Sequence, residues 1–114
     1  MTEPKARIQT FEAFWPYYLR EHGKASTRWM HWIGTNLAVL TLVNAVVIGR
    51  PLYALWALIP GYGFAWVSHF FIEKNRPATF TYPLWSLIGD FKMWGLMWTG
   101  RIRGEVERHV GAGS

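Results

Sequence analysis

The stretch WMHWIGTNLAVLTLVNAVVIGRPLYALWALIPGYGFAWVSHFFI, residues 29–72, carries only one formally charged side chain, Arg50. A membrane-spanning helix needs about 20 mostly apolar residues, because the hydrocarbon core is roughly 30 Å thick and a helix rises about 1.5 Å per residue. Residues 29–49 and 51–72 each meet this requirement, and little more than Arg50 separates them. The sequence therefore predicts an all-α membrane protein whose centre is a hairpin of two transmembrane spans.

Amphipathic segments flank this predicted hairpin. Apolar residues recur at intervals of three and four over residues 8–22, so this segment is predicted to be an amphipathic helix in the membrane interface. The next uncharged run after the hairpin is too short to cross a bilayer, so residues 83–99 are predicted to form an interfacial or re-entrant helix. Residues 101–114, rich in Arg, Glu and Gly, are expected to be a flexible tail. We expect residues 1–114 to form a single membrane domain.

The distribution of basic residues orients the chain. With two crossings, every Lys and Arg except Arg50 lies on one side, and short loops rich in Lys and Arg remain cytoplasmic. Both termini are therefore predicted to be cytoplasmic, in the inner membrane if the protein is bacterial. The net charge of +5 comes from basic residues that flank apolar runs and form no groove-sized patch, which favours contact with anionic lipid and argues against a nucleic-acid partner. The sequence leaves the oligomeric state open.

This topology places histidines at one membrane face. His31 begins the first span, His69 ends the second, and His22 ends the amphipathic segment just before the first span. Glu73 follows His69 by four residues, which puts both on one face of a helix. We therefore predict that these four residues converge at the lipid–water boundary, whereas His109 lies in the tail. Spacing alone does not separate a metal site from a buried hydrogen-bond network.

The inventory of side chains narrows the chemistry. The chain has no Cys, which excludes thiolate nucleophiles and Cys-ligated zinc or iron–sulfur sites. Nitrogen and oxygen ligands suit iron, zinc or manganese, and a His–carboxylate set with open positions is typical of non-haem Fe(II) oxygen chemistry. The sequence patterns of zinc peptidases and of serine hydrolases are both absent. A non-catalytic membrane scaffold or lipid-binding protein remains the alternative.

Three segments of the chain carry a family resemblance: FWPYYLREHGKASTRWMHWIGT (residues 14–35), GYGFAWVSHFFIEKNRPATF (residues 61–80) and YPLWSLIGDFKMW (residues 82–94). In order and spacing they resemble a family of small membrane proteins, long classed as a domain of unknown function, that includes a fungal endoplasmic-reticulum 2-hydroxy fatty acid dioxygenase. The third segment looks like the short bacterial branch of that family.

The resemblance implies Fe(2+)-dependent oxidation of a 2-hydroxy fatty acid with loss of its carboxyl carbon. On this basis His22, His31 and His69 match histidines that serve the metal. Glu73 matches the acidic position after the third histidine, for which we expect a catalytic role. Whether Glu73 or Asp90 is a further metal ligand is left open.

The resemblance also implies a lipid substrate whose tail stays in the bilayer. A 2-hydroxy acid has a carboxylate that cationic side chains near the interface can steer. Arg28, Lys74 and Arg76 are the candidates for this contact with the head group. The chain length of the substrate and its physiological pathway are left open.

Overall fold

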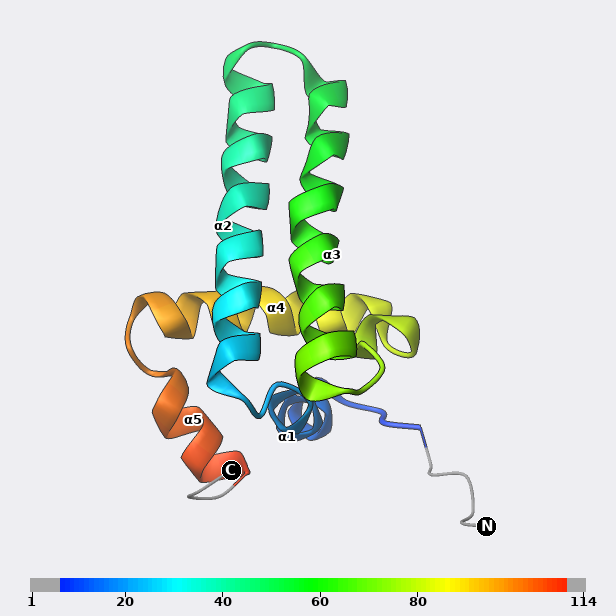
Figure 1. The fold of residues 1–114 in the computed structure, drawn as a ribbon, viewed down its shortest axis with the longest axis vertical. Helices are drawn as coiled ribbons and strands as arrows, with labels where there is room; N and C mark the ends of the chain where they lie inside the picture. Colours follow the sequence, from blue (N-terminus) through cyan, green and yellow to red (C-terminus); the bar gives the residue numbers. More distant parts are fainter. Residues whose placement is uncertain (1–6, 111–114) are drawn as a thin grey trace.

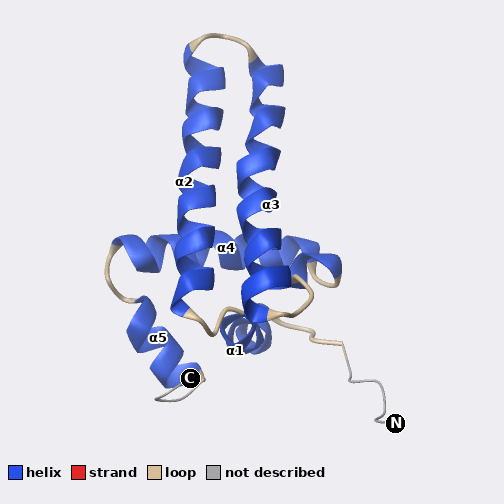
Figure 2. Ribbon diagram, viewed as in Figure 1, coloured by secondary structure: helices blue, strands red, loops and turns tan. Residues whose placement is uncertain are grey.

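The computed structural model describes residues 7–110, which form helices joined by short loops without any strand (Figure 2). This confirms the prediction of an all-α protein. The elements in chain order are α1 (Phe11–Glu21), α2 (Ala25–Val47), the 3₁₀ helix η1 (Pro51–Ala57), α3 (Leu58–Val67), the π-helix η2 (Ser68–Glu73), the 3₁₀ helix η3 (Ala78–Phe80), α4 (Pro83–Trp98) and α5 (Ile102–His109).

A long hairpin dominates the shape, with α2 as one arm and η1, α3 and η2 together as the other (Figure 1). Both arms, Ala25–Val47 and Pro51–Glu73, are long and apolar enough to cross a membrane. Only 17% and 22% of their most apolar windows are buried, whereas the core helix of a soluble protein is mostly buried. The hairpin therefore presents two exposed apolar surfaces of spanning length.

A glycine sets how closely the two arms approach. A Cβ added at Gly34 of α2 would lie 2.6 Å from the carbonyl oxygen of Pro60 and 2.9 Å from Cβ of Phe64. Any larger side chain would push the arms apart, because small residues are what allow helix backbones to pack this closely. His31 lies one turn before Gly34, so the same contact fixes its distance from the opposite arm.

Helices α1, α4 and α5 pack around the base of the hairpin (Figure 1). Thr10 begins α1 because its side-chain oxygen accepts a hydrogen bond from the N–H of Ala13 at 3.1 Å. Tyr18 of α1 is fully buried against α4, where a Cβ added at Gly89 would lie only 3.0 Å from the Tyr18 ring. The main buried cluster is formed at this base by Phe14, Trp15, Tyr18, Leu19, Ala78, Met93 and Val106.

The expectation of a flexible tail over residues 101–114 is wrong for its described part, which forms α5. The helix is held because Val106 is buried in the base cluster and Glu105 accepts a hydrogen bond from Nε1 of Trp15 at 2.9 Å. That partner is far away in sequence, so local composition gave no sign of it. Residues 111–114 of the predicted tail lie outside the described residues.

Candidate metal centre

Three buried histidines from three different elements meet where the hairpin joins its base. His22 caps the C-terminus of α1, His31 lies in the second turn of α2, and His69 lies in η2. Nε2 of His22 is 3.0 Å from Nε2 of His31 and 3.0 Å from Nε2 of His69. All three residues are at most 5% exposed, and their facing ring nitrogens lie within 4.8 Å of one another.

The other nitrogen of each ring is held by an oxygen that can only accept a hydrogen bond. These acceptors are the carbonyl of Tyr18 at 2.7 Å for His22, the carbonyl of Thr27 at 3.0 Å for His31, and Oδ1 of Asn75 at 2.7 Å for His69. Each Nδ1 must therefore carry the hydrogen. In the neutral rings Nε2 is then a bare acceptor, and three such lone pairs face one another.

This arrangement fits a metal ion. Burial, followed by the positive charge that His31 and His69 would carry, lowers the pKa of His22 well below its usual 6.5, so protonation does not relieve the contact near neutral pH. Neutral imidazole nitrogens are common ligands of iron and zinc. Two adjacent ligands with metal–nitrogen bonds of roughly 2.1 Å at a right angle lie roughly 3.0 Å apart. A single cation would satisfy all three lone pairs.

Asn75 is a supporting residue that the sequence analysis did not identify. The π-helix η2 ends at Glu73, and the left-handed backbone of the next residue, Lys74 (φ 60°), turns the chain back toward the preceding turn. As a result the N–H of Asn75 donates to the carbonyl of His69 at 2.9 Å while its Oδ1 accepts from the His69 ring. Its Nδ2 donates to the carbonyl of Glu21 at 3.1 Å, which ties the end of α1 to the same turn. Such outer contacts orient metal-binding histidines.

A small cavity of about 10 Å³ adjoins the histidines and is bordered on the side of α4 by Asp90. Tyr18 stacks on His22 with ring centroids 4.0 Å apart, and its hydroxyl donates to Oδ1 of Asp90. Burial raises the pKa of Asp90 to about 7, and it raises the pKa of Tyr18 well above 10. Asp90 is thus a group that gains and loses a proton near neutral pH at the edge of the cavity.

Glu73 does not lie with the three histidines. Its carboxylate accepts a hydrogen bond from the backbone N–H of Lys24 at 2.7 Å, which closes the turn between α1 and α2. Among residues 7–110, the ligand atoms that group together belong to the three histidines alone, so neither Glu73 nor Asp90 is part of that set. The catalytic role of Glu73 stays a prediction.

The predicted head-group residues differ in their surroundings. Arg28 is partly buried and donates to the carbonyl oxygens of His22 at 2.8 Å and Gly23 at 3.0 Å, so it supports the His22 backbone. Lys74 is exposed, and Arg76 is exposed with its guanidinium 5.2 Å from the centre of the Phe80 ring. His109 lies on α5 near Glu105, at 3.7 Å, and belongs to no metal cluster.

Comparison with known proteins identifies the family. The sequence model described as 2-hydroxy-palmitic acid dioxygenase Mpo1-like matches residues 8–102, from just before α1 to the first residue of α5. No curated protein and no solved structure matches the chain. The match spans most of the chain and includes the three histidines, Asn75 and Asp90. The chain therefore belongs to the 2-hydroxy-palmitic acid dioxygenase Mpo1-like family.

Proposed function

We propose that the protein is an Fe(II)-dependent membrane dioxygenase that shortens 2-hydroxy fatty acids by one carbon. The observation that carries the proposal is the convergence of three Nε2 atoms whose rings are fixed by Nδ1 hydrogen bonds. The family name supports both the substrate class and the type of reaction. Imidazole ligands together with oxygen chemistry point to iron rather than zinc, because zinc has no redox chemistry.

The reaction balances with oxygen as the only oxidant. One 2-hydroxy acid and one O₂ yield the acid shorter by one carbon, one CO₂ and one water, with cleavage of the bond between the carboxyl carbon and the hydroxyl-bearing carbon. Bound Fe(II) would supply the activation of O₂. His22, His31 and His69 would hold that ion.

The remaining residues bind, orient and move protons. Asp90, which accepts a hydrogen bond from Tyr18 and borders the histidine cavity, would take the proton of the substrate hydroxyl. The deep burial of the histidines keeps bulk water away from the reacting atoms. Lys74 and Arg76 are exposed at the same end of the hairpin, where they would attract the substrate carboxylate.

The membrane location is part of the proposal. In this proposal the two hairpin arms, which are long and apolar enough, cross the bilayer, and the asymmetry of Lys and Arg predicts that both termini are cytoplasmic. The histidines then lie near the cytoplasmic face, where an amphiphilic acid presents its polar end. Reporters fused at either terminus should read cytoplasmic, whereas a reporter inserted at Arg50 should read external.

The test measures metal content and product in detergent-purified protein. After anaerobic loading with Fe(II), the wild type should retain close to one iron per chain, and His69→Ala should lose most of it, while the matched control His109→Ala should keep it. With oxygen, 2-hydroxypalmitate should yield the odd-chain acid, and palmitate should be a far poorer substrate because it lacks the hydroxyl.

The possible failures point to different errors. A wild type that holds no iron after loading would support the non-catalytic scaffold instead. An iron-loaded protein that needs its histidines for metal, yet converts no 2-hydroxy acid of any chain length, would show that the reaction is wrong while the metal site is right.

A further inference from the structure

A second cavity of about 310 Å³ lies along the hairpin on the side that faces α4. Small residues from both arms line it, namely Ala38, Ala57 and Gly61, and a Cβ added at Gly61 would lie only 3.6 Å from Cβ of Ala38. Leu42 and Leu58 add apolar walls and are 40% and 55% exposed. We call this cavity the hairpin groove, and its volume lies within the range of small-molecule sites.

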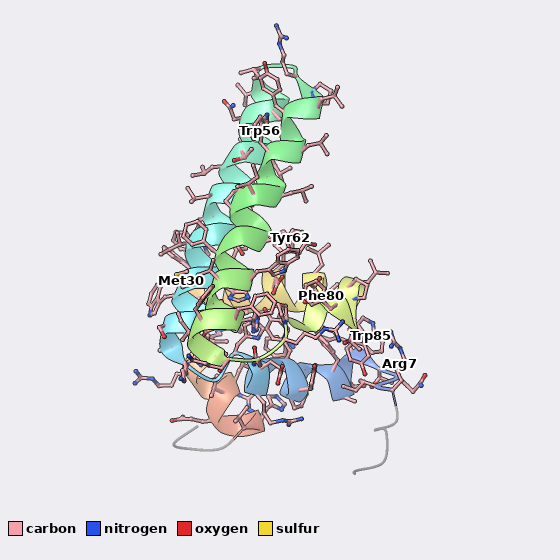
Figure 3. All side chains as sticks on the ribbon, turned by 45° about the vertical axis from the view of Figure 1, so that its right-hand side comes forward. Arg7, Met30, Trp56, Tyr62, Phe80 and Trp85 are labelled. Atoms are coloured by element: carbon pink, nitrogen blue, oxygen red, sulfur yellow. The ribbon has the colours of Figure 1, made fainter. Side chains whose placement is uncertain are left out.

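The hairpin groove is polar at one end only. Thr35, Tyr62 and Asp90 line it, and Tyr62 and Asp90 also line the small cavity beside the histidines. Figure 3 shows Tyr62 on the hairpin arm that contains α3, just above α4. Leu42 lies seven residues beyond Thr35 in α2, which is roughly 10 Å along the helix. The groove therefore adjoins the histidine cavity at Tyr62 and Asp90, and its apolar lining continues toward the far end of the hairpin.

We propose that the hairpin groove holds the acyl chain of the substrate, with the carboxyl end at the histidine cavity. The inference rests on the proposed function and adds which residues of the protein bind the acyl tail of the substrate. A ligand that is polar at one end and apolar along its length matches this lining, and a straight hydrocarbon chain fits a channel walled by Ala and Gly. The small residues Ala38 and Gly61 then determine how much of the acyl chain enters the groove.

The groove can be tested by photo-cross-linking, which does not depend on turnover. The probe is 2-hydroxypalmitate with a diazirine at a mid-chain carbon, added to protein in liposomes with and without Fe(II). The groove predicts labelling at Leu42 and Leu58, assigned to single residues by fragmentation of the labelled peptides and reduced at least fivefold by excess unlabelled 2-hydroxypalmitate. The proposal would be overturned if excess unlabelled 2-hydroxypalmitate did not reduce the labelling and if the labelling were spread over lipid-facing residues outside the groove, such as Leu40 and Leu52.

Variants that fill the groove provide the second measurement. Ala38→Phe should lower groove labelling about tenfold and shift the preferred substrate to shorter chains, with iron content unchanged. Leu40→Phe is the matched control, since Leu40 lies in the same helix, is 64% exposed and does not line the groove. If Ala38→Phe fails to fold, Leu42→Trp fills the far end from a position that is already 40% exposed.

The outcomes separate this proposal from the reaction. If excess unlabelled 2-hydroxypalmitate reduces labelling of the groove but no odd-chain product forms, the proposed reaction is refuted and the proposed acyl-chain site is retained. Product formation with an unchanged chain-length preference in both Ala38→Phe and Leu42→Trp would refute the groove and leave the reaction standing.

Discussion

Replacing Asn75 by Ala removes the oxygen that accepts the Nδ1–H of His69 at 2.7 Å. Without this acceptor the His69 proton can shift to Nε2, where it would point at the nitrogen of His22 and block metal binding. Loss of an outer hydrogen bond to a metal-binding histidine costs about 10–100-fold in metal affinity. For Asn75→Ala we therefore expect a loss of about 1.4–2.7 kcal/mol in metal-binding free energy.

The same change also removes the hydrogen bond from Nδ2 of Asn75 to the carbonyl of Glu21, which should lower the free energy of unfolding by about 0.5–1.5 kcal/mol. The two effects are separated by measuring metal affinity in competition with a chelator, and unfolding of the metal-free protein in detergent. Asn75→Asp is the matched control, because it keeps an acceptor for His69 and should retain most of the affinity. Metal affinity in Asn75→Ala within threefold of the wild type would refute the role assigned to this contact.

Three further predictions concern α4 and the end of the second hairpin arm. Gly89→Ala places a Cβ 3.0 Å from the buried Tyr18 ring and should lower the free energy of unfolding by about 1–3 kcal/mol. Gly95→Ala is the control: a Cβ there would have nothing within 4 Å, so the change should be neutral or slightly stabilising. An equal loss of unfolding free energy in both variants would contradict the close approach at Gly89. The catalytic role predicted for Glu73 implies that Glu73→Gln lowers kcat about 100-fold without loss of iron. If the variant kept the wild-type kcat, the role of Glu73 would be limited to its hydrogen bond in the turn at Lys24. The pKa of Asp90 is about 7 in the folded protein and 3.8 ordinarily, so the folded state alone binds this proton between these values. The wild type should therefore lose stability as pH rises through that window, by up to about 1.4 kcal/mol per pH unit, and unfolding titrations of Asp90→Asn should lack this contribution.

The helical class and the two candidate spans could be predicted from the sequence. Transfer of a segment into hydrocarbon depends on its own apolar content and length, and both are read directly from residues 29–72. The family could be identified for a similar reason, because the segments that carry the resemblance keep their order and spacing along the chain. The helix α5 could not be predicted in this way, since the contacts of Val106 and Glu105 that hold it come from α1 and α4.

The residues of the candidate site also differ in whether they could be predicted from the sequence. His22, His31 and His69 could be singled out because a hairpin brings the start of one span to the end of the next, and the structure does bring them together. The i+4 spacing from His69 to Glu73 predicted a fourth member of this group, but the Glu73 carboxylate instead accepts a hydrogen bond from the backbone N–H of Lys24.

The sequence by itself determined which segments are apolar enough to span a membrane and which residue types are available to bind a metal. Only the tertiary structure decided which nitrogen of each histidine faces its neighbours, that Asn75 orients His69, and that Asp90 lies between the histidine cavity and the hairpin groove. Apolar content acts segment by segment and is visible in the order of residues. Hydrogen-bond partners depend on directions and distances of a few ångströms, which are established only when the π-turn of η2, the close approach at Gly34 and the crossing at Gly89 have packed.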